Sequence, residues 1–242
     1  MSERKTKPAK ADELYERADA LFDEASGRDA LWDRLDDLYA AESVASADPQ
    51  VQLVKMPFST NVVDLVVDLA SAQELSIQVP AASESKKDAE RADAQEGWLR
   101  ALVRANERLQ RRNLVSQMAY LGTQRALVVL KTLFREEAVG EEEGGEFTLQ
   151  GLPVLLQVRD PRHMVWDEVA GDLSFVAERW TRKARTIRST YPKVLRDREK
   201  WPDDADVDWT EVWTRTQVAY FAGEEPVKVA GLAVRPHRYG CI

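Results

Sequence analysis

The pattern of hydrophobic and polar residues is clearest between Trp98 and Phe134. The first part of this segment is amphipathic, with an apolar stripe and an opposite charged face formed by Arg100, Arg104, Glu107, Arg108, Arg111 and Arg112. Gly122 then stands where a helix often ends in a residue of positive φ, and the run 125–130 is short and rich in β-branched residues. The pattern predicts a helix that leads into a strand buried on both faces.

The N-terminal residues show two shorter helical patterns. Apolar residues recur at helical spacing over 12–22 and again over 31–39, with Ser26 and Gly27 between them. We therefore expect two helices joined by a glycine turn, forming a helical arm over residues 1–45. The segment 42–49 is rich in small and polar residues and marks a boundary, so residues 46–242 are expected to form an α+β domain.

The next segment predicts a core helix followed by a strand. Ser59, Thr60 and Asn61 can accept the unpaired amide hydrogens of a first helical turn. An apolar stripe with the spacing i, i+3, i+4, i+7 follows, made of Val62, Leu65, Val66 and Leu69. Residues 75–79 alternate between apolar and polar side chains and predict a strand that ends at Pro80. Residues 81–97 fit either a solvated loop or the polar first turns of the helix around Trp98.

The C-terminal half predicts β-hairpins. The acidic run 136–146 lacks the ligand spacing of an EF-hand calcium loop, so we interpret it as the solvated tip of a hairpin over 124–158 whose second strand is 152–158. Ala170, Gly171 and Asp172 supply the turn of a second hairpin over 160–180. A third pair is predicted between 212–221 and 227–234. Together these elements predict one β-meander on a helical base, and an α+β fold class.

Composition limits the functional classes. The chain has 242 residues, 44% of them apolar, which is enough for a substantial core. Its 34 basic and 42 acidic residues give a net charge of −8, which argues against a dedicated nucleic-acid binder but leaves room for local basic patches. Cys241 is the single cysteine and excludes an intrachain disulfide. No segment has the apolar length of a membrane span or the pattern of a signal peptide, so we expect a soluble, non-secreted protein without membrane contact.

One charged segment stands out against this acidic background. Basic residues are concentrated from Arg179 to Lys200, and the candidate subunit-interface or DNA-facing residues among them are Arg182, Lys183, Arg185 and Arg188. The alternative is a solvated segment whose charge is balanced by the acidic residues of 203–211. We favour this alternative over contact with DNA.

The sequence offers little catalytic chemistry. His163 and His237 are the only histidines, and there is no cysteine pair for a zinc site. His163 lies near Asp160 and Asp167, but no nucleophile or glycine-rich turn accompanies it, so we interpret it as a histidine at a strand edge. No GxSxG, Walker A or GxGxxG motif occurs. We expect no enzymatic activity, no cofactor and no metal.

Several short motifs follow one another along the chain. The helical arm ends in Leu38-Tyr39, Asn61-Val62-Val63-Asp64 opens an apolar helix, and Trp98 and Asn106 follow in the next one. Gln117-Met118-Ala119-Tyr120-Leu121-Gly122 precedes a strand, Asp160-Pro161-Arg162 enters a hairpin, and Tyr239-Gly240-Cys241-Ile242 follows a β pair. Their order resembles the N-terminal part of the portal proteins of tailed bacteriophages. Each motif is short, and the resemblance rests on their order over roughly residues 30–242.

The resemblance implies a structural role in the virion. Portal proteins form a ring, usually of about twelve subunits, at one capsid vertex. Double-stranded DNA passes through the ring during packaging by terminase and again on ejection, while head-tail connector, capsid and scaffold proteins contact it. The part resembled is the outer α+β portion, called the wing. The resemblance thus implies a homododecamer that is assembled in the host cytoplasm and becomes part of the virion.

The stem, clip and crown of a portal find no counterpart in these residues, because the chain stops at Ile242. We therefore expect a truncated gene product, which leaves assembly of the isolated wing open. The acidic run 136–146 of one subunit and the basic stretch 179–200 of its neighbour are candidates for a head-to-tail contact. The competing interpretation is a stand-alone protein-binding adaptor, or a decayed prophage remnant without a role in DNA translocation.

Overall fold

The computed structural model describes residues 10–40, 58–72, 76–135, 138–143, 146–149 and 151–237. It has α-helices and antiparallel sheets, which confirms the predicted α+β class. The backbone forms two compact units, Met1–Leu31 with Arg162–Ile242, and Trp32–Pro161. The predicted division near residue 45 lies outside the described residues and stays a prediction.

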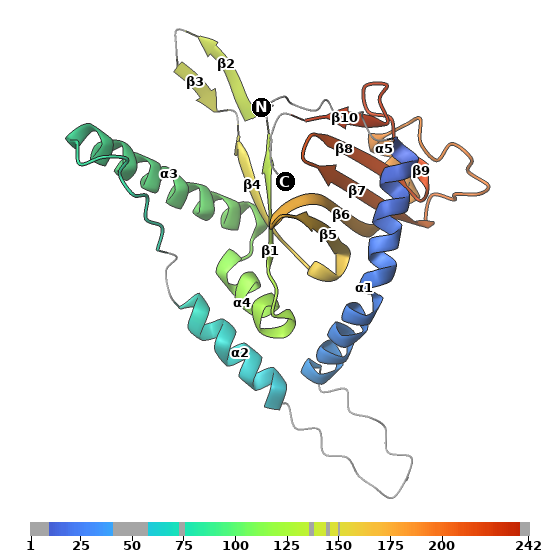
Figure 1. Ribbon diagram of the computed structural model, residues 1–242, viewed down its shortest axis with the longest axis horizontal. Coiled ribbons are helices and arrows are strands. Elements are labelled where there is room, and N and C mark those ends of the chain that lie inside the picture. Colours follow the sequence, from blue (N-terminus) through green and yellow to red (C-terminus); the bar gives the residue numbers. More distant parts are fainter. Residues whose placement is uncertain are drawn as a thin grey trace, which may run out of the picture. The chain divides into compact units, whose positions relative to one another are not determined.

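Helix α1 is one continuous helix, Ala11–Tyr39, so the predicted glycine turn between two shorter helices is wrong (Figure 1). Gly27 is not among the glycines of positive φ, and it costs the helix only about 1 kcal/mol relative to alanine. That cost is offset because Leu14 and Ala18 are buried against the sheet of the first unit. Packing of the apolar stripe therefore outweighs the local tendency of Ser26-Gly27 to end a helix.

The sheet of the first unit is a meander, but the predicted single meander is only partly correct, because the strands of 124–158 form separate sheets in the second unit. Its order is β10-β8-β7-β6-β5, with a short β9 on β8, and all pairs are antiparallel. The strands are β5 Met164–Val169, β6 Asp172–Lys183, β7 Asp206–Thr214, β8 Gln217–Ala222, β9 Glu225–Pro226 and β10 Val234–Pro236. The hairpin β5–β6 turns at Ala170-Gly171, as predicted, and both residues have positive φ.

Alternation along the strands gives this sheet two buried faces. Phe175, Val212 and Phe221 are fully buried on the face that packs against α1. Trp209 and Ala222 belong to a second cluster with Ile187 of helix α5, Ala184–Thr190. Neighbouring residues of a strand point to opposite faces of the sheet. Helix α1 covers one of these faces, and the segment that follows β6 covers the other.

The predicted third pair, 212–221 with 227–234, is only partly correct. Strand β8 does pair with the chain that follows it, in β9 and β10, but the predicted first strand is interrupted. The chain reverses earlier, so that β7 pairs with β8 and Trp213 lies opposite Val218. Thr214 explains the early turn, because its hydroxyl accepts a hydrogen bond from the amide of Gln217 at 3.1 Å. A second reversal at Gly223, where φ is +60°, leads into β9.

The second unit contains three further helices and two small sheets: α2 Phe58–Ser71, α3 Lys86–Gln110, α4 Leu114–Arg125, β1 Val129–Phe134, β2 Val139–Glu143, β3 Glu146–Leu149 and β4 Val154–Arg159. Strands β1 and β4 pair antiparallel from Val129 with Arg159 to Phe134 with Val154, which confirms a hairpin in this region. Strands β2 and β3 also pair antiparallel, but parts of the acidic run 136–146 lie outside the described residues.

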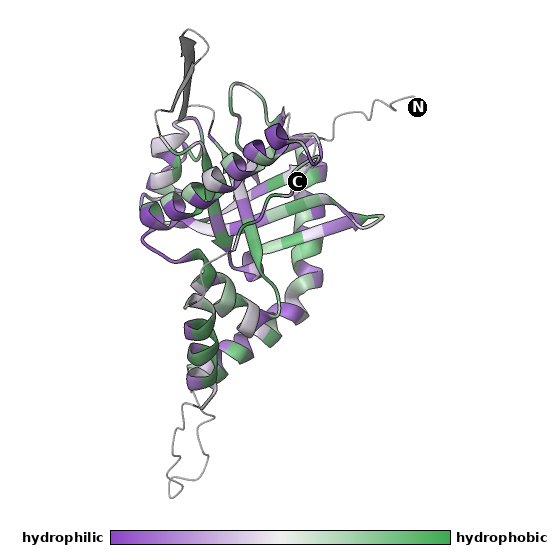
Figure 2. Ribbon diagram, turned by 90° about the vertical axis from the view of Figure 1, so that its left-hand side faces the viewer, coloured by the Kyte–Doolittle hydropathy of each residue, from purple (hydrophilic) through white to green (hydrophobic). Residues whose placement is uncertain are grey.

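Three predictions for this unit are wrong. The run 125–130 is not a strand buried on both faces, because Arg125 ends α4, Ala126 takes a left-handed conformation at φ +52°, and β1 alternates between half-buried and exposed residues. Residues 76–79 form no strand. Strands β1 and β4 pair only with each other, so residues 76–79 have no strand to pair with. Helix α2 is mostly hydrophobic (Figure 2), but its predicted core stripe is exposed to solvent.

Two glycines test how the backbone conformation sets local stability. We expect Gly27→Ala to stabilise the protein by about 0.5–1 kcal/mol, because the added Cβ meets no atom within 4 Å and the residue is helical. Gly171→Ala is the matched control, since its Cβ also meets nothing within 4 Å but φ is +82°. We expect it to destabilise by about 1 kcal/mol. Urea unfolding measures both, and equal effects of the two substitutions would contradict the assigned conformations.

Candidate functional site

The junction of α3 and α4 is held by backbone and side-chain caps. Arg111 ends α3 in a left-handed conformation at φ +52°, and the amide of Arg112 donates to the carbonyl of Glu107 at 3.2 Å. The Asn113 side chain then accepts from the amide of Ser116 at 2.9 Å and begins α4. The Glu107 carboxylate accepts from the amide of Leu114 at 3.0 Å, so a side chain of the first helix caps the second.

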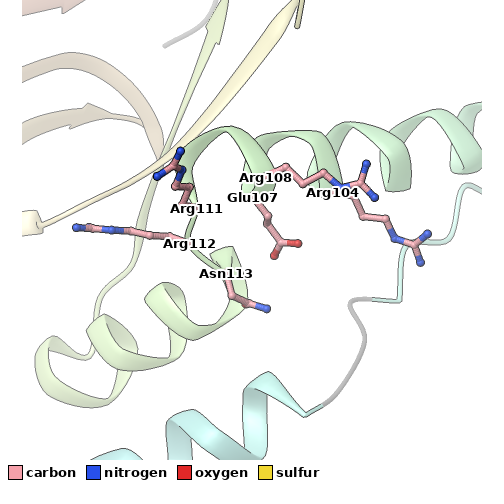
Figure 3. Close-up of a pocket in the computed structure, with 6 residues that line it drawn as sticks. All are labelled: Arg104, Glu107, Arg108, Arg111, Arg112 and Asn113. Carbon is pink, nitrogen blue, oxygen red and sulfur yellow. The ribbon is translucent and has the colours of Figure 1, made fainter.

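An arginine cluster surrounds this junction (Figure 3). It lines a cavity of about 340 Å³ together with Glu107 and Asn113, and its members are Arg104, Arg108, Arg111 and Arg112. Glu107 and Asn113 point toward the space beside α4, whereas the arginine side chains spread outward in several directions. Such a spread suits anionic groups distributed over a surface better than a single small ion.

Most members of the cluster have no internal partner. Within the described ranges, the side chains of Arg108, Arg111 and Arg112 form no hydrogen bond or ion pair. The helix C-terminus favours nearby cations, which is a purely structural reason for arginine here. That reason accounts for the last turn of α3 but leaves the guanidinium groups of Arg108, Arg111 and Arg112 without an ion-pair partner among the described residues. The sequence placed these residues on the charged face of one helix, which is correct for Arg104 and Arg108. It is wrong for Arg111 and Arg112, because α3 ends at Gln110 and these two residues lie in the junction before α4.

The outer face of α3 is also apolar beside this charge. The amphipathic pattern placed Trp98, Leu102, Leu109 and Leu114 on one stripe. Leu102 and Leu114 are buried, but Trp98 is 48% exposed and Leu109 59% exposed. The latter two are eleven residues apart, which is close to three helical turns, so they lie on the same face of α3. This half of the predicted stripe therefore faces solvent.

The exposed face of α2 is the larger apolar surface. Its exposed fractions are 43% for Val62, 58% for Leu65, 40% for Val66 and 61% for Leu69. The opposite side of α2 packs on α4, where the hydroxyls of Ser71 and Ser116 are 2.6 Å apart. The periodicity was thus correct, but the sequence could not show that this stripe meets no part of the described chain.

Polar contacts fix the N-terminal end of α2. The hydroxyl of Tyr39 donates to the carboxylate of Asp64 at 2.8 Å. Ser59 and Thr60 donate their hydroxyls to the carbonyls of Leu38 and Tyr39. The end of α1 therefore holds α2 in place, with the apolar face turned outward.

Two buried polar residues, Asn106 and Arg125, connect helices α3 and α4 to other elements of the second unit. Asn106 is fully buried, and its side chain donates to the carbonyl of Val154 at 3.1 Å and accepts from the amide of Leu156 at 2.8 Å. Arg125 is also buried and forms ion pairs with Asp36 at 2.9 Å and with Asp160 at 3.2 Å. Asn106 and Asp160, both singled out in the sequence, thus bind α3 to β4 and the end of β4 to α4.

The candidate basic residues of the second half lie around α5, and three of the four have internal contacts. Arg182 lies over the ring of Trp209 at 5.2 Å, and Lys183 pairs with Asp206 at 2.8 Å. Arg188 donates to the carbonyls of Leu195 and Trp201 and pairs with Asp203. Arg185 is exposed. These contacts agree with a segment balanced by its acidic neighbours, and a role in DNA or subunit contact stays a prediction.

Three further features bear on function: His163, potential metal ligands and the apolar character of the helices. His163 is exposed in a single turn of 3₁₀ helix, Pro161–His163, just before β5. No group of three or more potential metal ligands occurs among the described residues. None of the helices in the described part of the chain has the length and apolar character that crossing a membrane requires.

No protein-family model matches this chain, and the search of curated proteins finds no match. The function of the two exposed helix faces and the arginine cluster must therefore be inferred from their residues and geometry.

The contact between Tyr39 and Asp64 predicts a pH dependence. The hydrogen bond to the Asp64 carboxylate raises the pKa of Tyr39 from 10.0 to about 12. Because this folded-state pKa is raised, the stabilisation is complete below pH 10 and is lost as the pH rises toward 12. We expect Tyr39→Phe to cost about 0.5–1 kcal/mol at pH 8, and this difference to shrink above pH 10. Urea unfolding at several pH values measures it, and a difference that stays constant up to pH 12 would contradict the assignment.

Proposed function

We propose that this chain is the wing portion of a portal protein of a tailed bacteriophage. It would be a subunit of the ring at the capsid vertex through which double-stranded DNA is packaged and ejected. The observation that carries the proposal is the ordered series of motifs from Asn61 to Ile242. In such a ring the protein would work with terminase and head-tail connector proteins, without catalytic chemistry of its own.

The structural positions of these motifs support the proposal. Asn61 to Asp64 lie in the first turns of α2, and Asp64 accepts the hydrogen bond from Tyr39. Asn106 anchors β4, and Asp160 neutralises Arg125. Asp64, Asn106 and Asp160 thus hold neighbouring elements together, which suits a structural subunit, whereas Tyr239 to Ile242 lie outside the described residues.

The exposed apolar faces of α2 and α3 support assembly. Contiguous apolar surface exposed by a single chain is typical of sites that contact another protein. The net charge of −8 also suits a channel wall, because a repulsive surface lets duplex DNA slide instead of holding its phosphates. Both features agree with a subunit that binds its neighbours strongly and DNA weakly.

A stand-alone adaptor is the second candidate. The same exposed face of α2 favours it, because a single amphipathic helix face can dock a partner protein of another kind. The two candidates differ in self-association. A portal subunit must bind copies of itself, whereas an adaptor needs only its partner.

Self-association is measured by light scattering after size exclusion, combined with negative-stain electron microscopy. We expect closed rings of about twelve subunits at tens of micromolar protein, because a contact between two different surfaces closes into a ring when the rotation allows it. A species that remains near the chain mass of 27.4 kDa at every concentration would contradict self-assembly and favour the adaptor.

A further inference from the structure

We propose that the exposed apolar face of α2 in one copy packs on the outer face of α3 in the next copy. This inference rests on the proposed function, since it assumes that the partner is a second copy of the same chain. It names the two surfaces that would form the contact within the ring.

The two faces match in their apolar groups. Val62, Leu65, Val66 and Leu69 form a stripe of about two helical turns on α2, all of them at least 40% exposed. On α3, Trp98 and Leu109 are exposed at the two ends of a face that carries Ala101 and Ala105 between them. Small residues between two large ones allow the ridge of a second helix to approach closely.

The two faces also match in charge. Asp68 is exposed one helical turn from Leu65 and has no partner among the described residues. Arg108 is exposed next to Leu109 and likewise has no partner within the described ranges. Each face thus has one charged flank, acidic on α2 and basic on α3. Packing one face on the other would pair two charges that a single copy leaves uncompensated.

The charges disfavour contacts between identical faces. Two α2 faces packed on each other would bring Asp68 near its own counterpart, and two α3 faces would bring arginines together. Like charges across an interface cost free energy and select against that pairing. The contact is therefore between different surfaces, which is the arrangement that produces rings.

Within the described ranges, neither face is covered by its own copy. Helix α2 uses its other side to pack on α4, where Ser71 meets Ser116, and the Tyr39 contact holds it there. Helix α3 uses its other side to bind β4 through Asn106. Both apolar faces consequently point away from the elements that hold these helices.

Chemical cross-linking of single-cysteine variants tests the contact. Cys241, the only cysteine, is first replaced by serine, and Leu65→Cys and Ala101→Cys are then made separately in the full chain. With a short bismaleimide, we expect a cross-linked dimer in a mixture of the two variants and none with either variant alone. Cross-linking of Leu65→Cys with itself to the same extent, or no dimer in the mixture, would overturn the proposal.

Charge exchange provides a second test. We expect Asp68→Arg and Arg108→Asp each to weaken self-association at least tenfold, and the double variant to recover most of it. Asp23→Arg is the matched control, because it makes the same charge change at an exposed position of α1 and should have no effect. The proposal fails if the single variants behave like this control, or if the double variant is no better than either of them.

The mass of the assembly separates this inference from the proposed function. Cross-linking between α2 and α3 in open chains or dimers that never close would support the contact and contradict the portal ring. Closed rings in which Leu65→Cys and Ala101→Cys do not cross-link would support the portal ring and contradict this contact.

Discussion

The buried guanidinium of Arg125 is the constraint on which the second unit depends. A buried cation without partners costs several kcal/mol, so the surrounding chain must supply negative charge. Asp36 accepts two hydrogen bonds from it, at 3.0 and 2.9 Å, and Asp160 pairs with it at 3.2 Å. The three residues come from α4, from the last turns of α1 and from the segment after β4. Correct folding of this unit therefore requires all three segments to meet at one side chain.

The frame around Arg125 determines which surfaces remain free. Because α4 is fixed there, α2 can pack on it through the Ser71 side, while Tyr39 holds the first turn of α2. Asn106 in turn fixes β4 against α3. These contacts are polar and internal, and the apolar faces of α2 and α3 remain exposed in the part of the chain that the structure describes. Stability and assembly thus depend on different residues of the same helices.

The sequence predicted the features that local chemistry controls. Gly171 marked the turn of the β5–β6 hairpin, because positive φ angles are a local requirement. Asn61 and its neighbours do lie in the first turn of α2, but Ser59 and Thr60 donate their hydroxyls to the end of α1 instead of capping the helix as predicted. The continuity of α1 through Gly27 could not be predicted, since burial of distant residues outweighed the local signal. Arg125 was mistaken for the start of a strand because its partners lie 89 and 35 residues away.

The candidate site was harder to predict for a different reason. Apolar periodicity shows that a helix has a face to bury, but it does not show whether the cover comes from the same chain or from another one. This is why the stripe of Leu65 and Leu69 predicted a core helix and proved to be exposed. The arginines around Glu107 were visible as a charged face, but only the turn between α3 and α4 brings them together.

If another copy of the chain covers the outer faces of α2 and α3, as proposed, both faces become protected when the protein self-associates. Hydroxyl-radical footprinting over a range of protein concentrations measures this protection. We expect oxidation of Leu65 and Trp98 to fall together as self-association proceeds, while oxidation of Leu173, which is 39% exposed at the end of the β5–β6 hairpin, stays constant. Oxidation of Leu65 and Trp98 that does not change while the mass of the particles increases would contradict it.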